Sequence, residues 1–474
     1  MKRRLIIGGL LMASLIRITT VEGYAQEGMT LEKCRSLALE NNKAMTIAQR
    51  NQEKAEYTRN AYRANFFPKL SATANYLYTN AEMNRSLPAS YLPTFVPDPA
   101  TGQLVPNLLT ATGSEIPVFK EYAYFPEMDL SLKLSNSWMA GLRAEQPLFM
   151  GGKIATGYAM AKTGNEMARL NRELTEADLL VKVDEAYWGY VQTKEMMQAA
   201  LSYQTVVGEL LRNVMDAESV GLIHRNEVMK VQVKANEAEL RLRQAENGVN
   251  LARKNLCHLM GWQLDSPVEL PDAPEDIAWD GVDDAADYTT RPEYALLQQQ
   301  VVMKQQQVKL TRADFLPQIG VMANYGYMNG LELNGSKLID KASFSVLASV
   351  TIPIFQWGEG RNKVRAAKVE QEIMQLQRDE MGEMMELELA KALDRCDESR
   401  LEVRLTSQSL QQAEENQTLS RDRYQEGMET LANYLEAQTV WQQAWSEHIR
   451  AKTNQRLNRT YYLKAAGKLN AETK

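Results

Sequence analysis

The residue types that most often carry enzyme chemistry or bind metals are few and widely spaced in this chain. Its three histidines, at His224, His258 and His448, fit no pattern of metal ligands. Its three cysteines are odd in number and far apart, at Cys34, Cys257 and Cys396, which argues against a disulfide framework. We find no phosphate-binding loop, nucleophile elbow or Cys-x-x-Cys pair. We therefore expect no catalytic residue, no metal site and no cofactor, and a protein that is not an enzyme.

Composition narrows the class of protein further. The chain has 474 residues, of which 24% are charged and 44% hydrophobic, so it can bury a core and fold. Its formal net charge is −6, and it has no dense basic stripe that could displace the counterions of a nucleic acid. Nucleic acid is therefore not expected as a partner.

The first residues have the pattern of a secretory signal peptide. Lys2, Arg3 and Arg4 precede an apolar run that ends near Ile16, and small residues including Ala25 follow. We assign residues 1–25 to the signal peptide, which places the mature protein in the periplasm or beyond. No later stretch reaches about 18 apolar residues without charges, so no transmembrane helix is predicted. A mature protein that enters a membrane must then do so as a closed β-barrel.

An internal duplication organises the rest of the chain. The segment Arg-Ala-Asn-Phe-Phe-Pro ends at Pro68, and its copy Arg-Ala-Asp-Phe-Leu-Pro ends at Pro317, an offset of 317 − 68 = 249. The segment Pro-Leu-Phe-Met-Gly-Gly begins at Pro147, and Pro-Ile-Phe-Gln-Trp-Gly begins at Pro353, an offset of 353 − 147 = 206. The 43-residue difference, 249 − 206, predicts an insertion in the first copy, which we place within the segment from about residue 80 to 126 because it is rich in Pro, Asn, Thr and Gly.

Each copy is predicted to contain a helix, two strands and a helical hairpin. The first repeat covers residues 26–262, with strands near 69–79 and 128–146 and a hairpin near 152–261. The second covers residues 293–474, with strands near 318–328 and 341–353 and a hairpin near 358–466. Residues 263–292 are the connector between the repeats.

The predicted strands alternate between apolar and polar residues. Leu70, Ala72 and Ala74 alternate with Ser71 and Thr73, and the other three strands repeat this period of two. Such a pattern fits a barrel strand that faces lipid on one side and water on the other. It equally fits a soluble sheet with one buried face. Four strands leave two open edges, and membrane barrels start at about eight strands. A membrane barrel built from this chain therefore requires an oligomer.

Long helical segments and four prolines complete the pattern. The apolar spacing from residue 152 to about 217 predicts a helix of roughly 100 Å, which favours coiled-coil packing. Prolines mark the expected joints between strands and helices, at Pro68, Pro147, Pro317 and Pro353. We interpret these joints as the change from a barrel to a helical tube.

With its duplicated motifs and the glycine turns at Gly221 and Gly427, the chain resembles the TolC-like outer membrane efflux proteins over nearly its whole mature length. The resemblance implies a mixed α/β membrane protein, a homotrimer in the outer membrane of a Gram-negative bacterium. Four strands from each protomer would form one 12-stranded β-barrel that continues into a long periplasmic α-helical coiled-coil barrel. It also implies two protein partners, a periplasmic adaptor and an inner-membrane transporter of the RND or ABC type, besides the lipid of the outer membrane.

The resemblance also assigns a periplasmic gate at the hairpin tips. Tyr424, three residues before Gly427, corresponds to a tyrosine that bonds to an acidic residue, here Glu227, and holds the hairpins closed. The two positions that carry aspartates in well-known members are Asn433 and Glu436, so one acidic ring remains. Glu429 stands where those members have an arginine, with Arg225 as a candidate partner.

The same tips are the expected docking surface for the adaptor. Its residues are Gly221, Leu222, Ile223, Gly427 and Met428, because paired glycines let another chain approach closely. The predicted function is a passive outer-membrane exit duct of a tripartite efflux pump for drugs and other toxic small molecules. Two alternatives within transport are type I protein secretion and metal efflux. A different class of protein, a soluble periplasmic coiled-coil scaffold or adaptor, remains a further alternative.

Overall fold

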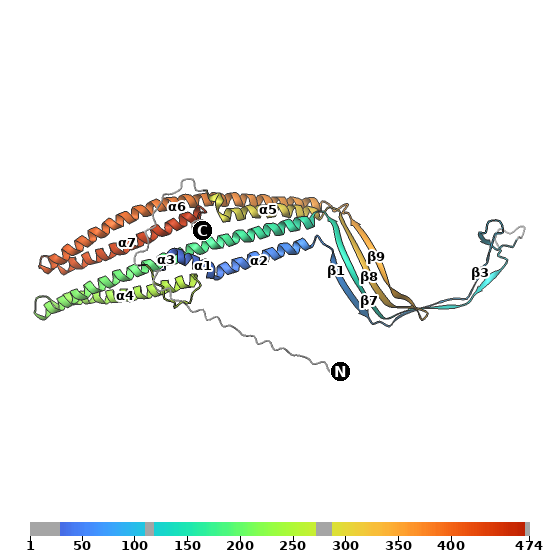
Figure 1. Ribbon diagram of the computed structural model, residues 1–474, viewed down its shortest axis with the longest axis horizontal. Helices are drawn as coiled ribbons and strands as arrows, with labels where there is room; N and C mark the ends of the chain where they lie inside the picture. The colour runs from blue at the N-terminus through green and yellow to red at the C-terminus, as the bar shows by residue number, and fades with distance from the viewer. Residues whose placement is uncertain (1–28, 110–117, 272–286, 470–474) are drawn as a thin grey trace, which may run out of the picture. The chain divides into compact units, whose positions relative to one another are not determined.

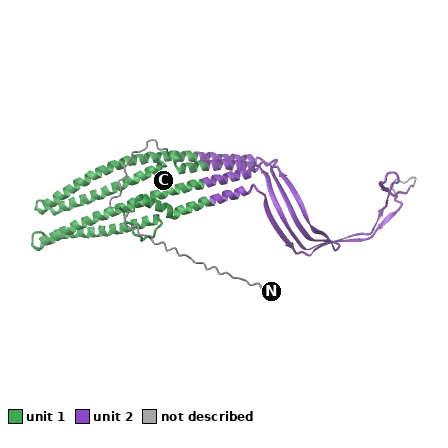
Figure 2. Ribbon diagram, in the orientation of Figure 1, with its two compact units in different colours: residues 1–53, 167–299, 376–474 green, residues 54–166, 300–375 purple. Residues whose placement is uncertain are grey.

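A computed structural model describes residues 29–109, 118–271 and 287–469 of the chain (Figure 1). The predicted signal peptide and part of the connector lie outside these described residues. The chain divides into two compact units, shown in Figure 2. We call residues 1–53, 167–299 and 376–474 the helical unit, and residues 54–166 and 300–375 the sheet unit.

The sheet unit contains an antiparallel sheet whose four main strands follow the order β1-β7-β8-β9, and a fifth strand, β2 (Ala81–Leu87), also pairs with β7. Its main strands are β1 (Lys69–Leu77), β7 (Met128–Met150), β8 (Gln318–Leu333) and β9 (Ser336–Thr351). Each repeat therefore contributes two neighbouring strands, and β7 and β8 join the repeats. In the described part of the chain, β1 and β9 each have one unpaired edge.

The two faces of this sheet differ sharply in polarity. Ala72, Leu142, Tyr325 and Phe344 are successive partners across the four strands. Three of them, Leu142, Tyr325 and Phe344, are exposed by 62%, 56% and 67%. The adjacent residues of the same strands face the other way, and they form the polar row Ser71, Arg143, Asn324 and Ser345. The sheet thus has an uncovered apolar face and a polar face.

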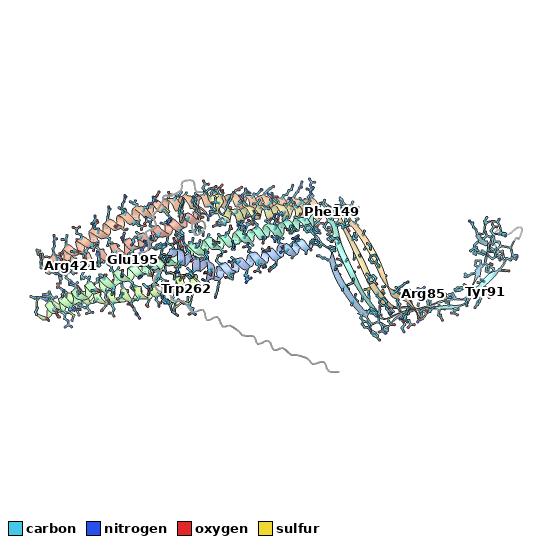
Figure 3. All side chains as sticks on the ribbon, viewed as in Figure 1. Arg85, Tyr91, Phe149, Glu195, Trp262 and Arg421 are labelled. Atoms are coloured by element: carbon cyan, nitrogen blue, oxygen red, sulfur yellow. The ribbon has the colours of Figure 1, made fainter. Side chains whose placement is uncertain are left out.

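The insertion in the first repeat is more regular than its turn-rich composition suggests. Its strands are β2 (Ala81–Leu87), β3 (Ser90–Pro93), β4 (Phe95–Pro97), β5 (Leu104–Pro106) and β6 (Tyr122–Phe125). They pair in succession, β2 with β7, β3 with β6 and β4 with β5, as a narrow ribbon. Exposed aromatic rings lie along it. Tyr91, labelled in Figure 3, is exposed by 69% and lies 5.3 Å from the ring of Tyr124.

The helices repeat with matched lengths. They are α1 (Leu31–Asn41), α2 (Lys43–Ala64), α3 (Lys153–Ser219), α4 (Arg225–Leu259), α5 (Pro292–Ala313), α6 (Glu359–Gln425) and α7 (Leu431–Ala465), with a short 3-10 turn at Tyr288–Thr290. Helices α3 and α6 each have 67 residues, and α4 and α7 each have 35. The last residues of α3 and α6 are 425 − 219 = 206 residues apart, which is also the offset between the second pair of sequence motifs.

Close contacts between short helices and hairpin ends recur in both repeats of the helical unit. The side-chain amide of Asn42 donates to the carbonyl of Leu259 at 2.8 Å. In the second repeat the Thr290 hydroxyl donates to the carbonyl of Ala466 at 3.3 Å. Gly261 and Gly467, which follow α4 and α7, have positive φ angles of 74° and 69°. The end of each hairpin is therefore hydrogen-bonded to the residues just before a 22-residue helix, α2 or α5.

The core of the helical unit consists of three apolar clusters, and one buried ion pair lies near two of them. Asp184 of α3 has no exposed surface and pairs with Arg35 of α1 at 2.5 Å. The three cysteines are buried as free thiols. Burial raises the pKa of the Cys34 thiol to about 12 and that of Cys396 to about 11, so both favour the unreactive protonated form.

In the described ranges, no helix combines the length and the apolar character needed to span a membrane.

Candidate functional site

Both hairpin tips have the same turn geometry. At the first tip, the Gly221 N–H donates to the Glu218 carbonyl and the Leu222 N–H to the Ala217 carbonyl, both at 2.9 Å. At the second tip, the Gly427 and Met428 N–H groups make the equivalent bonds. These bonds give hydrogen-bond donors to the last carbonyls of the helix, and they require a residue with a left-handed backbone conformation. Gly221 and Gly427 supply it, with φ angles of 77° and 76°.

Apolar side chains are exposed at these turns. Leu222 is exposed by 78% and Met428 by 68%, and Val220 next to Gly221 is also exposed. Ile223 differs from the other residues predicted for docking, because it is half-buried and packs against the apolar cluster between the two hairpins. The tips therefore present a small apolar surface around two glycines with open space above them.

Tyr424 contacts a residue that the sequence did not indicate. Its ring stacks on the ring of Tyr434, with centroids 5.4 Å apart and planes inclined by 14°. Burial raises the pKa of Tyr424, and the nearby Glu227 carboxylate raises it further. The predicted pair is thus close enough to interact electrostatically, but among the described residues no hydrogen bond joins Tyr424 to Glu227.

Tyr434 and Gln438 form a buried polar pair beside this stack. The Gln438 side-chain amide donates to the Tyr434 hydroxyl at 2.9 Å, and both residues are buried. Tyr434 also belongs to the apolar cluster that joins α7 to α3 and α4. Leu431 and Tyr434 are three residues apart, so they lie on the same face of a helix. This spacing is the sequence feature that could have indicated that Tyr434 packs in the core.

The remaining predicted gate residues lie in or before the first turns of α7. Thr430 caps this helix by accepting a hydrogen bond from the Asn433 N–H at 3.3 Å. The side chains of Asn433 and Glu436 are exposed, whereas Glu429 is half-buried. In the described chain neither Glu429 nor Arg225 forms an ion pair, so this structure does not bring the candidate pair together.

Three of the four predicted proline joints fall between elements. Pro68 and Pro317 each immediately precede a strand, and Pro353 lies between β9 and α6. Pro147 differs from the prediction, because it lies inside β7, which continues to Met150. The ladder to β8 shifts register between Pro147 and Phe149. A proline has no N–H to donate to a ladder, so a bulge accommodates it within the strand.

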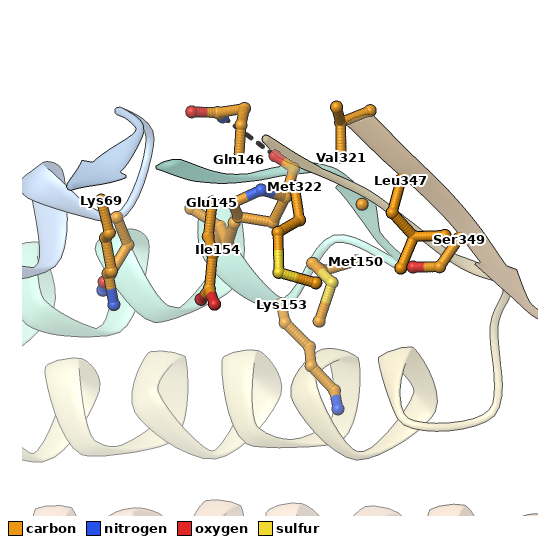
Figure 4. A pocket seen from close by; sticks show the side chains of 13 residues that line it. Lys69, Glu145, Gln146, Met150, Lys153, Ile154, Val321, Met322, Leu347 and Ser349 are labelled. Atoms are coloured by element: carbon orange, nitrogen blue, oxygen red, sulfur yellow. Dashed lines mark hydrogen bonds between the residues drawn. The ribbon is translucent and has the colours of Figure 1, made fainter. Parts of the chain in front are cut away.

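A cavity of about 410 Å³ lies in the sheet unit near this bulge (Figure 4). Its lining comes from the helix-side ends of the strands and from the start of α3. Lys69, Glu145 and Met322 contribute side chains from three strands. Figure 4 shows these side chains on one side of the sheet and Val321 on the other.

Comparison with known proteins identifies the fold. The described fold is similar over 99% of this chain to the Campylobacter jejuni CmeC outer membrane channel, with a TM-score of 0.72, 18% identity and 94% of that chain covered. Among curated proteins, the chain is 24% identical over 331 residues to the alkaline protease secretion protein AprF of Pseudomonas aeruginosa. It is 25% identical over 327 residues to the outer membrane protein OprJ of the same species. These alignments cover 67% and 65% of the chain, and the same shares of AprF and OprJ.

The repeated strand pairs and hairpins define the architecture of an outer-membrane duct protein. Residues 34–262 and 290–467 match the family described as Outer membrane efflux protein. The chain belongs to this family, which confirms the resemblance seen in the sequence. It is an outer-membrane exit duct of a Gram-negative bacterium, with its helical part in the periplasm. The family consists of transport ducts rather than enzymes.

Proposed function

We propose that three copies of this chain form one 12-stranded barrel and a continuous helical tube. The observation that carries this proposal is the sheet with the main strand order β1-β7-β8-β9, in which β1 and β9 each have an unpaired edge and one face is apolar and uncovered. Unpaired backbone groups cannot remain in lipid, so β1 of one copy would pair with β9 of the next. The apolar face would then contact outer-membrane lipid and the polar face would line the duct.

The partners in this proposal are a periplasmic adaptor and an inner-membrane transporter, and the cargo consists of small toxic molecules. Leu222 and Met428 support docking at the tips, because each is an exposed apolar side chain beside a glycine turn. Protein secretion is the second candidate, favoured by the similarity to AprF, which is named a secretion protein. Family membership argues against the soluble scaffold.

The first experiment is native mass spectrometry and planar-bilayer recording of the detergent-purified mature protein. A trimeric mass together with a small, stable conductance supports the duct. A monomeric mass with no membrane insertion would contradict it. The transporter and adaptor can be identified by co-purification from the native host, and a partner devoted to protein export would favour secretion over efflux.

We also propose that the tip residues Tyr424, Glu227, Glu429, Asn433 and Glu436 form the gate. The exposed Glu436 supports an acidic ring, since three copies would place three carboxylates around one axis. Glu436→Ala should raise conductance or reduce block by divalent cations. Glu426→Ala is the matched control, because it removes another exposed carboxylate, just after the end of α6. Unchanged conductance and unchanged cation block in Glu436→Ala would place the constriction elsewhere.

A further inference from the structure

Four residues, one from each strand, form a single row at the helix-side end of the sheet. In the strand register, Lys69 lies opposite Glu145, Glu145 lies opposite Met322, and Met322 lies opposite Leu347. Directly opposed residues of neighbouring strands lie on the same face of a sheet, with their Cβ atoms about 5 Å apart. The row therefore places an ammonium group and a carboxylate beside two apolar side chains.

This row is one wall of the cavity near the β7 bulge. The volume of about 410 Å³ lies within the range of sites that hold small organic molecules. Ile154 at the start of α3 adds another apolar surface, and Gly320 lines the cavity without a side chain. Met322 can adapt to ligands of different shapes because its side chain is unbranched and flexible.

The charges around the cavity are unequally compensated. Glu145 pairs with Arg143 at 3.5 Å, and Lys153 pairs with Asp314 at 2.6 Å. Within the described part of the chain, Lys69 has neither an ion-pair partner nor a side-chain hydrogen bond. An exposed ammonium group therefore lies at the rim of an apolar cavity, and its charge is complementary to an anionic head group.

We propose that this cavity is a transient binding site for an anionic amphiphile that passes through the duct. The head group would contact Lys69, and the apolar body would lie against Met322, Leu347 and Ile154. This inference rests on the proposed duct, because the polar face of the sheet becomes its inner wall only in the closed barrel. The cavity then favours carboxylates or sulfonates with an apolar tail over amphiphilic cations.

The test compares octanoate with octylammonium, which have the same chain length and opposite charge, in single-channel recordings of the full mature protein. Octanoate should interrupt the current for longer than octylammonium. Lys69→Gln should shorten the octanoate interruptions about threefold, the size expected for an exposed ion pair. Lys69→Glu should reverse the preference between the two probes, and Met322→Ser should shorten the interruptions by both.

Lys341→Gln is the matched control. Lys341 lies on the same polar face, at the row that contains Met139 and Met328, and does not line the cavity. It should leave the interruptions unchanged. If both lysine substitutions have an equal effect, the proposed site is wrong, and the positive charges of the duct wall attract octanoate without a specific site. A conducting channel whose octanoate interruptions are insensitive to Lys69 would overturn this inference alone, whereas absence of any conductance would overturn the duct as well.

Discussion

Asp184 accepts two hydrogen bonds from Arg35, from Nε at 2.7 Å and from Nη2 at 2.5 Å. The carboxylate also accepts a bond from the Thr460 hydroxyl at 2.6 Å. These three residues lie on α3, α1 and α7, so one buried carboxylate joins the first helix, a hairpin of the first repeat and a hairpin of the second.

Asp184→Ala should lower the free energy of unfolding by about 3–5 kcal/mol, because it removes the buried carboxylate that accepts two hydrogen bonds from the Arg35 guanidinium. Thermal unfolding of the detergent-solubilised protein, followed by the helical circular dichroism signal, measures this. Glu370→Ala is the control. It breaks a pair with Lys304 whose side chains are 57% and 41% exposed, respectively, and should cost less than about 1 kcal/mol. Equal losses in the two variants would contradict the role of burial.

Gly261→Ala should destabilise the protein, and Gly248→Ala should not. An added Cβ at Gly261 would lie 2.7 Å from the Asn41 carbonyl oxygen, at a φ of 74° that costs other residues about 1–2 kcal/mol. Gly248 lies within α4, and the nearest atom to its added Cβ is Thr193 Cγ2 at 4.0 Å. Alanine there should add about 0.5–1 kcal/mol of stability through helix propensity. Denaturant unfolding of the two variants measures whether each substitution lowers or raises the free energy of unfolding.

Tyr424→Ala should loosen closure of the tip more than Tyr424→Phe. The ring stacks on Tyr434, and such pairs contribute about 0.5–1.5 kcal/mol beyond their buried area. Phenylalanine keeps this stack, and alanine removes it. The measurement is the frequency of large-conductance openings in planar bilayers. If Tyr424→Phe opens as often as Tyr424→Ala, then the hydroxyl group holds the tip and its bond to Glu227 forms in the closed assembly.

Stability should fall below neutral pH, partly through His448. Burial of the ring and the nearby Lys452 lower its pKa from 6.5, and Glu195 acts in the opposite direction. The unfolded chain therefore takes up this proton more readily than the folded protein. The stability that the neutral ring contributes above the unfolded pKa is lost as pH falls through the folded pKa. His448→Gln should show a smaller drop in melting temperature between pH 8 and pH 5; an identical drop would exclude this residue as the cause.

The sequence was sufficient to predict the features that repeat locally. The glycines and prolines at constant offsets predicted hairpins near residues 152–261 and 358–466, and the structure has helices from Lys153 to Leu259 and from Glu359 to Ala465. The period of two predicted the four strands, because one face of each is apolar. β1 begins at Lys69, where the first predicted strand begins.

Contacts between distant parts of the chain could not be predicted in this way. Nothing in the spacing of Arg35 and Asp184 shows that they meet, since they are 149 residues apart. The strands of the insertion were missed because short paired segments among prolines and glycines have no long period. At the tip, the family pattern placed Tyr424 near Glu227, but it could not show that the Tyr424 ring also stacks on Tyr434.

The matched lengths of the two hairpins constrain how this protein can change during evolution. A residue deleted from α3 alone would shorten that helix by about 1.5 Å, and a deleted heptad by about 10 Å. The tip of one hairpin would then fall short of the other, whereas the proposed docking requires Leu222 and Met428 to reach the same partner. We therefore expect a viable change in length to occur in both hairpins, at positions 206 residues apart, so that insertions and deletions in homologous chains come in pairs.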